Sequence, residues 1–336
     1  MRKSWELSQI REKLTRMSTQ FKMPEIQKES DGMSVNDGGK ARFERTQLAR
    51  ALGICAMIAV VVLWPAAGYS EPLRLRVMTF NLKYASESGT NTWGDRRHVV
   101  KNAILSEHPD LIGTQEGLYW QLKQIDADLP EYTWIGLGRA GGSKDEFMAI
   151  FYKRDRFEPL AYDHFWLSDT PRVIGSRTWG HDNRRMVTWV LFRDSITGVE
   201  FYHWNTHFDH QVQAAREKSA DLLVSELRKT KPIRPLIVTG DFNASQTNIV
   251  HRKMLARGQG QVYLRDAWEE ADVRDGEQIA TLHGWRGPND SDRRIDWVLI
   301  SPEFTCTRAK VVTYQENGQY PSDHFPVVCE LELRRP

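Results

Sequence analysis

The sequence predicts a layered α/β sandwich whose sheets are not purely parallel. Short apolar or alternating segments typical of strands are interspersed with helical patterns, but the two kinds do not alternate strictly, as they would in a parallel α/β fold. The segments continue from residue 73 to residue 333 without an internal repeat or a long linker. We therefore expect a single domain over residues 71–336.

The first half of this domain contains three expected strands and two expected helices. Residues 73–82 (LRLRVMTFNL) alternate apolar and polar before becoming apolar, and residues 110–116 (DLIGTQE) form a second short apolar run. Residues 94–108 and 120–129 have helical spacing, and each segment is followed by a proline that ends it. Residues 147–153 (FMAIFYK) predict the third strand.

The second half begins with an expected hairpin and contains one long helix. Residues 187–194 and 199–208 flank a Thr-Gly turn signal, and residues 213–229 have the apolar spacing of an amphipathic helix. Three more strands are expected, at residues 235–243, 293–301 and 325–333.

The N-terminal 70 residues differ in character from this domain. Residues 1–50 are polar and weakly patterned, so we expect a disordered extension. Residues 51–68 (ALGICAMIAVVVLWPAAG) carry no charge, follow three arginines and lead into small residues, as in a secretory signal. We expect residues 51–70 to direct secretion or transfer to the periplasm. The alternative is a membrane anchor formed by residues 51–68, and membrane contact is expected only there.

The cysteines allow two interpretations. If the protein is exported, Cys306 and Cys329 could form one disulfide, whereas otherwise they are two small buried thiols. No Cys/His pattern with zinc spacing occurs in the sequence.

Charge gives no support for a polyanionic partner. The chain has 46 basic and 44 acidic residues, of which 11 and 7 precede residue 51. Residues 51–70 carry none, so residues 71–336 hold 35 basic and 37 acidic residues. Strong nucleic-acid binders usually have a basic excess, although a local basic patch remains compatible with these numbers.

Polar residues follow or interrupt the apolar strands at several points. Such groups are costly to bury without partners, and a single one is commonly a turn cap or a surface residue. Many at one edge would instead form a site, in which carboxylates bind Mg²⁺ and imidazoles stabilise phosphate charge. The residues concerned are Asn81, Glu116, His207, Asp241, Asn243, Asp296, Asp323 and His324.

At these residues the sequence resembles the endonuclease/exonuclease/phosphatase superfamily. The matching motifs occur in the family's order: TFNL at 79–82, TQE at 114–116, Glu146 with IFY, NTHFDH at 205–210, GDFNA at 240–244, RIDWVL at 294–299 and PSDHFPV at 321–327. The resemblance implies a four-layer α/β sandwich, in which two mixed β-sheets pack face to face with helices outside. It also implies hydrolysis of phosphate esters with Mg²⁺ or Mn²⁺.

The resemblance implies roles for the acidic and amide residues. Glu116 would be the principal metal ligand, with Asn81 and Asp323 near the metal. Asp241 would orient or deprotonate the attacking water, and Asn243 would bind the phosphate or that water.

It also implies roles for two imidazoles. His324 would contact the phosphate and be held by Asp296. His207 would be the second imidazole, with Glu146 as its partner, although Glu146 also fits a solvated loop. A carboxylate behind each imidazole would raise its pKa and fix its tautomer.

A second set of residues could contact the substrate. Arginine, tryptophan and histidine side chains lie in segments around these motifs, and surface ion pairs or core packing would explain them equally well. The candidates are Arg97, Trp179, Arg185, Asp209 and His283.

The partner that we expect is a phosphoester substrate, which could be a nucleic acid, and the sequence indicates no obligate protein partner. We favour a phosphodiesterase or nuclease. The alternative is a phosphomonoesterase or phospholipase-type enzyme acting on a sugar, inositol or lipid phosphate. A catalytically silent binding module is disfavoured because the polar set is intact.

Overall fold

The structure is a computed structural model that describes residues 72–257, 262–289, 291 and 293–333. These residues belong to one compact unit spanning residues 69–336. The expected extension (1–50) and the expected signal or anchor (51–70) lie outside the described residues. Among the helices that the structure describes, none is both long and apolar enough to span a membrane.

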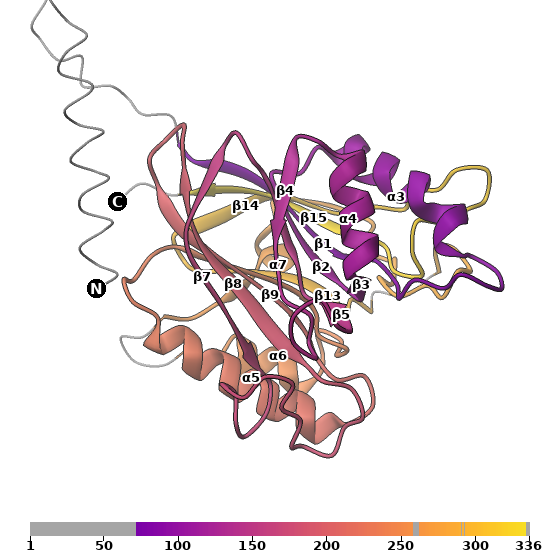
Figure 1. The fold of residues 1–336 in the computed structure, drawn as a ribbon. Helices are drawn as coiled ribbons and strands as arrows, with labels where there is room; N and C mark the ends of the chain where they lie inside the picture. The colour runs from indigo at the N-terminus through magenta and orange to yellow at the C-terminus, as the bar shows by residue number, and fades with distance from the viewer. Residues whose placement is uncertain (1–71, 258–261, 290, 292, 334–336) are drawn as a thin grey trace, which may run out of the picture. The chain divides into compact units, whose positions relative to one another are not determined.

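Two mixed β-sheets form the body of this unit (Figure 1). One has seven strands, in the order β12 (Val273–Asp275), β14 (Phe304–Val311), β15 (Val327–Leu333), β1 (Arg74–Asn81), β2 (Leu111–Gln115), β6 (Ile150–Lys153) and β4 (Tyr132–Ile135). The other has six, in the order β11 (Arg265–Asp266), β13 (Asp296–Ile300), β10 (Leu236–Asp241), β9 (Glu200–His207), β8 (Met186–Asp194) and β7 (Phe157–Trp166). The β1–β2 and β9–β10 pairs are parallel, whereas β1–β15 and β10–β13 are antiparallel.

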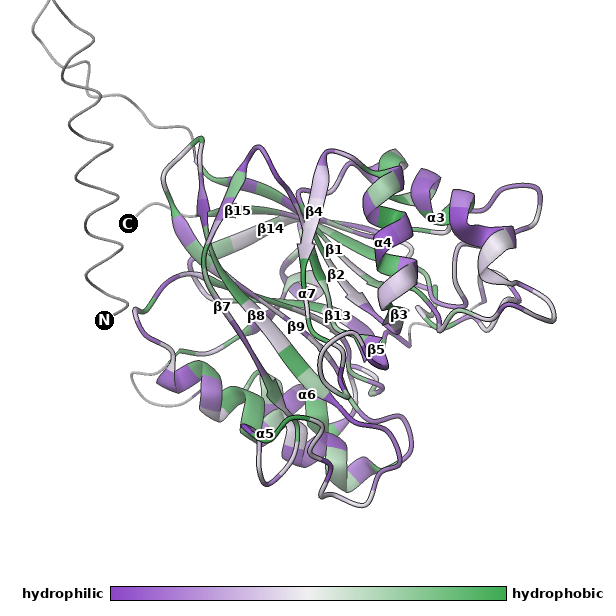
Figure 2. Cartoon of the chain, in the orientation of Figure 1, coloured by the Kyte–Doolittle hydropathy of each residue, from purple (hydrophilic) through white to green (hydrophobic). Residues whose placement is uncertain are grey.

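Helices cover the outer faces of both sheets. The helices α3 (Trp93–Glu107) and α4 (Tyr119–Asp128) share an apolar cluster with the seven-stranded sheet, and α5 (Gln213–Lys229) and α6 (Ile249–Met254) share one with the six-stranded sheet. A short helix, α7 (Ala267–Glu270), packs against β13 and β14. Figure 2 shows apolar residues along much of the sheets, whereas α4 and α5 carry both polar and apolar residues.

A third apolar cluster fills the space between the sheets. It contains Val77 and Leu111 from the larger sheet and Phe201 and Ile237 from the smaller one, and all four are fully buried. The predicted sandwich of two mixed sheets with helices outside is therefore confirmed.

The strand predicted over residues 147–153 is wrong in one respect, because it is two strands. β5 (Glu146–Phe147) pairs with β3 (Gly117–Leu118) in a separate small sheet, whereas β6 pairs with β2 and β4. Residues 147–152 are all buried, so the apolar run continues through the point where β5 ends and β6 begins to pair with other strands.

A polar network joins the two sheets beneath the end where the predicted site residues gather. Gln115 Nε2 donates to Asn205 Oδ1 (2.8 Å), and Asn205 Nδ2 donates to the backbone carbonyls of Thr114 (2.8 Å) and Ala149 (3.0 Å). Gly113 lies against this network, and a Cβ there would lie 2.6 Å from Asn205 Oδ1. Because buried polar groups need their partners, the network fixes how the sheets face each other.

Candidate active site

Strand register brings the predicted residues to one end of the two sheets. Asn81 ends β1, and Glu116 directly follows β2, its parallel neighbour. In the other sheet, Asp241 at the end of β10 lies opposite His207 of β9 and Asp296 of β13. The packing of the sheets therefore assembles the site from residues far apart in sequence.

Asn81 connects the carboxylates of the two sheets. Its Nδ2 donates to Glu116 Oε1 and to Asp241 Oδ2, both at 3.0 Å. Its Oδ1 accepts the backbone N–H of Lys83 at 3.0 Å, and Glu116 Oε2 accepts that of Tyr84 at 2.8 Å. These bonds hold the two carboxylates at a set separation.

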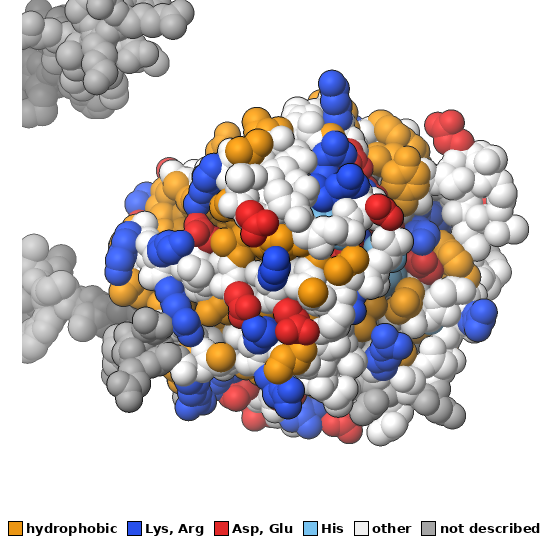
Figure 3. All heavy atoms as spheres, turned by 90° about the horizontal axis from the view of Figure 1, so that it is seen from below, with side chains coloured by type: hydrophobic (Ala, Val, Ile, Leu, Met, Phe, Trp, Pro, Cys, Tyr) orange, Lys and Arg blue, Asp and Glu red, His pale blue; other side chains and the backbone are white. Residues whose placement is uncertain are grey.

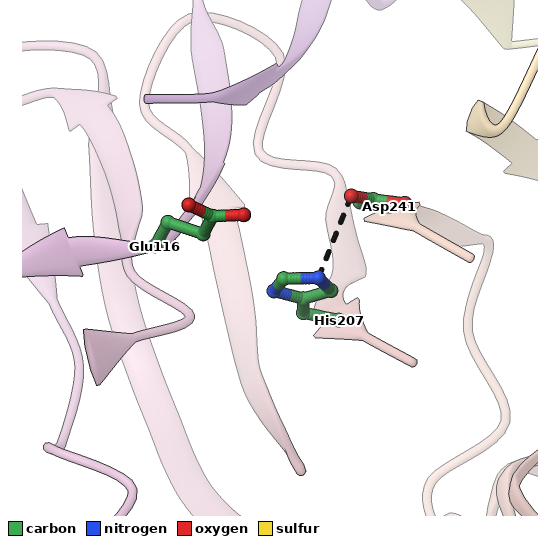
Figure 4. Close-up of side chains that lie close together, drawn as sticks. All are labelled: Glu116, His207 and Asp241. Carbon is green, nitrogen blue, oxygen red and sulfur yellow. Dashed lines mark ion pairs between the residues drawn. The ribbon is translucent and has the colours of Figure 1, made fainter. Parts of the chain in front are cut away.

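Asp241 lies at the centre of the site, and Figure 4 shows its carboxylate beside His207, with the carboxylate of Glu116 nearby. Asp241 Oδ2 is 3.4 Å from His207 Nε2 and 3.9 Å from His324 Nε2. Burial, and then the negative charge of Asp296, raise the pKa of Asp241 to about 7. A carboxylate with such a pKa can accept a proton from water near neutral pH.

His324 and Asp296 form the predicted pair. His324 Nδ1 lies 2.9 Å from Asp296 Oδ2, and both side chains are buried. Burial lowers the pKa of His324, but the charge and hydrogen bond of Asp296 outweigh it and raise the pKa to about 10. His324 is therefore a buried imidazolium that can face a phosphate.

The predicted pairing of His207 with Glu146 is wrong. Arg139 occupies Glu146 instead, with its Nη1 2.7 Å from Oε2 and its Nη2 2.8 Å from Oε1. His207 Nδ1 is buried and has no hydrogen-bond partner among the described residues, while Nε2 lies 3.1 Å from Asn243 Nδ2. Burial, followed by the charges of Arg185 and Arg139, holds the pKa of His207 well below its usual range.

The residues present fit a divalent cation. Ligand atoms of Glu116, His207 and Asp241 all lie within 4.8 Å of one another. Burial raises the pKa of Glu116, but Lys83 and His324 lower it below its usual range, so this carboxylate is charged. Carboxylate oxygens of this kind suit Mg²⁺ or Mn²⁺. Metal binding by Asn81 and Asp323 stays a prediction.

Three of the five candidate substrate residues lie close to this site. Arg185 is buried, with its Nε 3.7 Å from Asp209 Oδ2 and its Nη2 3.0 Å from His210 Nδ1. His283 stacks on Phe325, with ring centroids 3.9 Å apart, next in sequence to His324.

The other two candidates make contacts elsewhere. Arg97 forms a two-pronged pair with Asp128 of α4, at 2.7 and 2.8 Å. The indole of Trp179 donates to Asp169 Oδ1 at 2.8 Å and packs against the cluster beneath α5. Contact of these two residues with the substrate stays a prediction.

Three basic residues of the site were not predicted from the sequence. Arg96 is buried and donates to the backbone carbonyls of Leu82, Lys83 and Pro321. These three residues belong to the two segments that lie beside Glu116. Arg139 binds Glu146, and Lys83 pairs with a predicted metal ligand. Burial of Arg96 could have been predicted from helical spacing, because it shares the buried face of α3 with residues 93, 100 and 103.

The family of the chain follows from its similarity to known proteins. Residues 78–324 match the sequence profile of the Endonuclease/Exonuclease/phosphatase family. The chain belongs to this family. The prediction from the strand-end motifs is confirmed, and so is the expectation that the protein is a phosphoesterase by family.

Solved structures of family members are similar over their whole length. An endonuclease/exonuclease/phosphatase family protein of Bacteroides thetaiotaomicron is 35% identical, with a TM-score of 0.73 over 79% of this chain and 100% of that one. A mannosyl-6-phosphatase of the same organism is 34% identical, with a TM-score of 0.71 over 76% of this chain and 99% of that one.

Among curated proteins, Nocturnin of Drosophila melanogaster is 24% identical in an alignment 287 residues long that covers 73% of this chain. The chain spans 43% of the length of that relative.

Proposed function

We propose that this protein is a Mg²⁺- or Mn²⁺-dependent phosphatase that hydrolyses a small phosphate monoester, with a sugar phosphate as the favoured class. The observation that carries the proposal is the hydrogen-bonded set at the joint end of the sheets. There Asn81 links Glu116 to Asp241 at 3.0 Å, and His324 is paired with Asp296.

Each residue has a part in the proposed reaction. A divalent cation held by Glu116 would neutralise charge on the phosphate. Asp241 would take a proton from the attacking water, since its pKa is raised to about 7. His324, as an imidazolium, would donate to a phosphate oxygen, and Asn243 would orient the water or the phosphate.

Three observations support a monoester over the phosphodiester that the sequence favoured. The similarity to the mannosyl-6-phosphatase covers nearly all of that protein. In addition, Arg97 and Trp179, which would have served a nucleic-acid cleft, are engaged by Asp128 and Asp169. On the face shown in Figure 3, basic side chains are scattered among other types and form no continuous band.

The test uses purified residues 71–336 with Mg²⁺ or Mn²⁺. Mannose 6-phosphate, p-nitrophenyl phosphate, bis-p-nitrophenyl phosphate and single-stranded DNA are assayed side by side, with EDTA as the metal control. We expect turnover of the monoesters, abolished by EDTA and reduced by about 10²–10³-fold in His324→Ala and Asp241→Asn. Cleavage of the diester or the DNA alone would instead favour the phosphodiesterase.

We also propose that the enzyme acts outside the cytoplasm. The proposal rests on the uncharged segment 51–68 and the small residues that follow it. Detection of the mature protein only in the cytoplasm of cells expressing the full chain would contradict it.

A further inference from the structure

Lys83 lies at the active site, although no motif singled it out. Its Nζ is 3.0 Å from Asp323 Oδ2, and the exposed fractions of the two side chains are 41% and 10%. The charge of Lys83 also acts on Glu116 and lowers the pKa of that carboxyl. An ammonium group that solvent can reach therefore stands beside two predicted metal ligands.

The backbone holds Lys83 firmly at this position. Its φ is +60°, a left-handed conformation that is uncommon for a residue other than glycine. Its N–H donates to Asn81 Oδ1 at 3.0 Å, and its carbonyl accepts from Arg96 Nη2 at 2.8 Å. Uncommon backbone conformations persist where the surrounding contacts enforce them, which is frequent at functional sites.

We propose that Lys83 is a substrate-binding residue that exchanges partners: its ammonium, which pairs with Asp323, would turn to a phosphate oxygen when a divalent cation is bound. The inference rests on the proposed function, because it requires a metal and a phosphate at this site. The flexible four-carbon stem of lysine allows such a move while the backbone stays fixed.

Charge explains why the exchange is expected. The charge of Lys83 offsets that of Asp323 and, in part, that of Glu116, so a cation held by these carboxylates would compete with it. With that charge neutralised by a cation, the ammonium would lose its partner, and a phosphate dianion would supply a new one. Lys83 therefore competes with the metal but assists the phosphate.

The proposal predicts opposite changes in two affinities. We expect Lys83→Gln to bind Mn²⁺ about three- to tenfold more tightly, because a competing charge at a partly exposed position is removed. We expect the same variant, saturated with Mn²⁺, to bind inorganic phosphate about tenfold more weakly, because a charge-assisted hydrogen bond is lost. Both are measured by isothermal titration calorimetry, and Lys83→Arg should restore the phosphate affinity.

Lys153→Gln is the matched control. Lys153 Nζ also lies 3.0 Å from a carboxylate, that of Asp110, with exposed fractions of 31% and 12%. Asp110 precedes β2 and Glu116 follows it, so this pair lies at the opposite end of the same strand. We expect both affinities of Lys153→Gln to match those of the unmodified protein.

The outcomes separate the two proposals. If the unmodified protein binds neither Mn²⁺ nor phosphate and hydrolyses no ester, the proposed function fails. If the unmodified protein does all three and Lys83→Gln behaves like Lys153→Gln, only the inference about Lys83 is overturned. Weaker Mn²⁺ binding in Lys83→Gln would overturn it too, because it would mean that Lys83 supports the metal site instead of competing with it.

Discussion

His207 and His324 both approach Asp241, but their surroundings differ. Asp296 lies behind His324 and, against the effect of burial, raises its pKa to about 10, whereas burial and then the charges of Arg185 and Arg139 keep the pKa of His207 low. A protein that needs one charged and one neutral imidazole at a single site can obtain them by this difference in partners. The motifs NTHFDH and PSDHFPV each contain one of these histidines but do not indicate their charges.

The His324–Asp296 pair predicts a pH-dependent effect on stability. The folded pKa of His324, about 10, exceeds the unfolded value of roughly 6.5, so folded protein binds the proton more tightly. This contribution is fully present below about pH 6.5 and is lost as the pH rises through about 10. We expect Asp296→Asn to lower the free energy of unfolding, with a larger loss at pH 6 than at pH 10.

Urea unfolding of both proteins at the two pH values measures this effect. Taking the difference between variant and unmodified protein removes the contributions of titrating groups that do not interact with Asp296, and leaves those of His324 and Asp241. An equal loss at pH 6 and pH 10 would show that Asp296 does not stabilise the charged imidazole.

At the scale of single elements, local pattern located the helices better than the strands. The helices expected at 94–108, 120–129 and 213–229 are α3, α4 and α5, each within one residue of its predicted bounds. Two long strands, β7 and β14, were not predicted, and both contain a register shift that breaks the alternation. Helical spacing depends on the segment alone, whereas a strand depends on the partner beside it.

Substitution of two glycines would show, through the free energy of unfolding, how closely the elements pack around them. A Cβ at Gly113 of β2 would lie 2.0 Å from Thr239 Oγ1, whereas one at Gly94 of α3 would meet only Thr92 Oγ1, at 3.8 Å. We expect Gly113→Ala to lower the free energy of unfolding by about 3 kcal/mol or more. Gly94→Ala, the control, should leave it unchanged or raise it by up to about 1 kcal/mol.

Thermal and urea unfolding of the two variants measure these changes in the free energy of unfolding. Equal stability of Gly113→Ala and Gly94→Ala would mean that the two sheets can separate locally to admit a methyl group.

At the scale of the whole molecule, charge limits the kind of substrate. Residues 71–336 carry 35 basic and 37 acidic residues, so no net positive field attracts a polyanion. Near the site the arginines are also engaged, since Arg139 pairs with Glu146 and Arg185 lies beside Asp209. A small anion that reaches Lys83 and His324 fits this distribution better than an extended one.

This charge balance predicts how the enzyme responds to nucleic acid. We expect single-stranded DNA to inhibit monoester hydrolysis little at roughly 150 mM salt, and the inhibition to change little as the salt is lowered, because few phosphate contacts form. Inhibition constants for a DNA oligomer measured at two salt concentrations test this. Tight inhibition that weakens steeply with salt would point to a nucleic-acid substrate.

From the chain alone we could predict the layered α/β class, the family and the residues Asn81, Glu116, Asp241 and His324. These are properties of local pattern and of short motifs, which are legible along the chain. The folded structure was needed to show that Arg139 holds Glu146, that Arg96 rather than Arg97 faces inward, and that Lys83 meets Asp323. Lys83 and Asp323 come from distant segments that meet because β1 pairs with β15, and strand pairing cannot be read from either segment alone. Arg139 and Glu146 are close in sequence, but the turn that brings them together has no regular pattern.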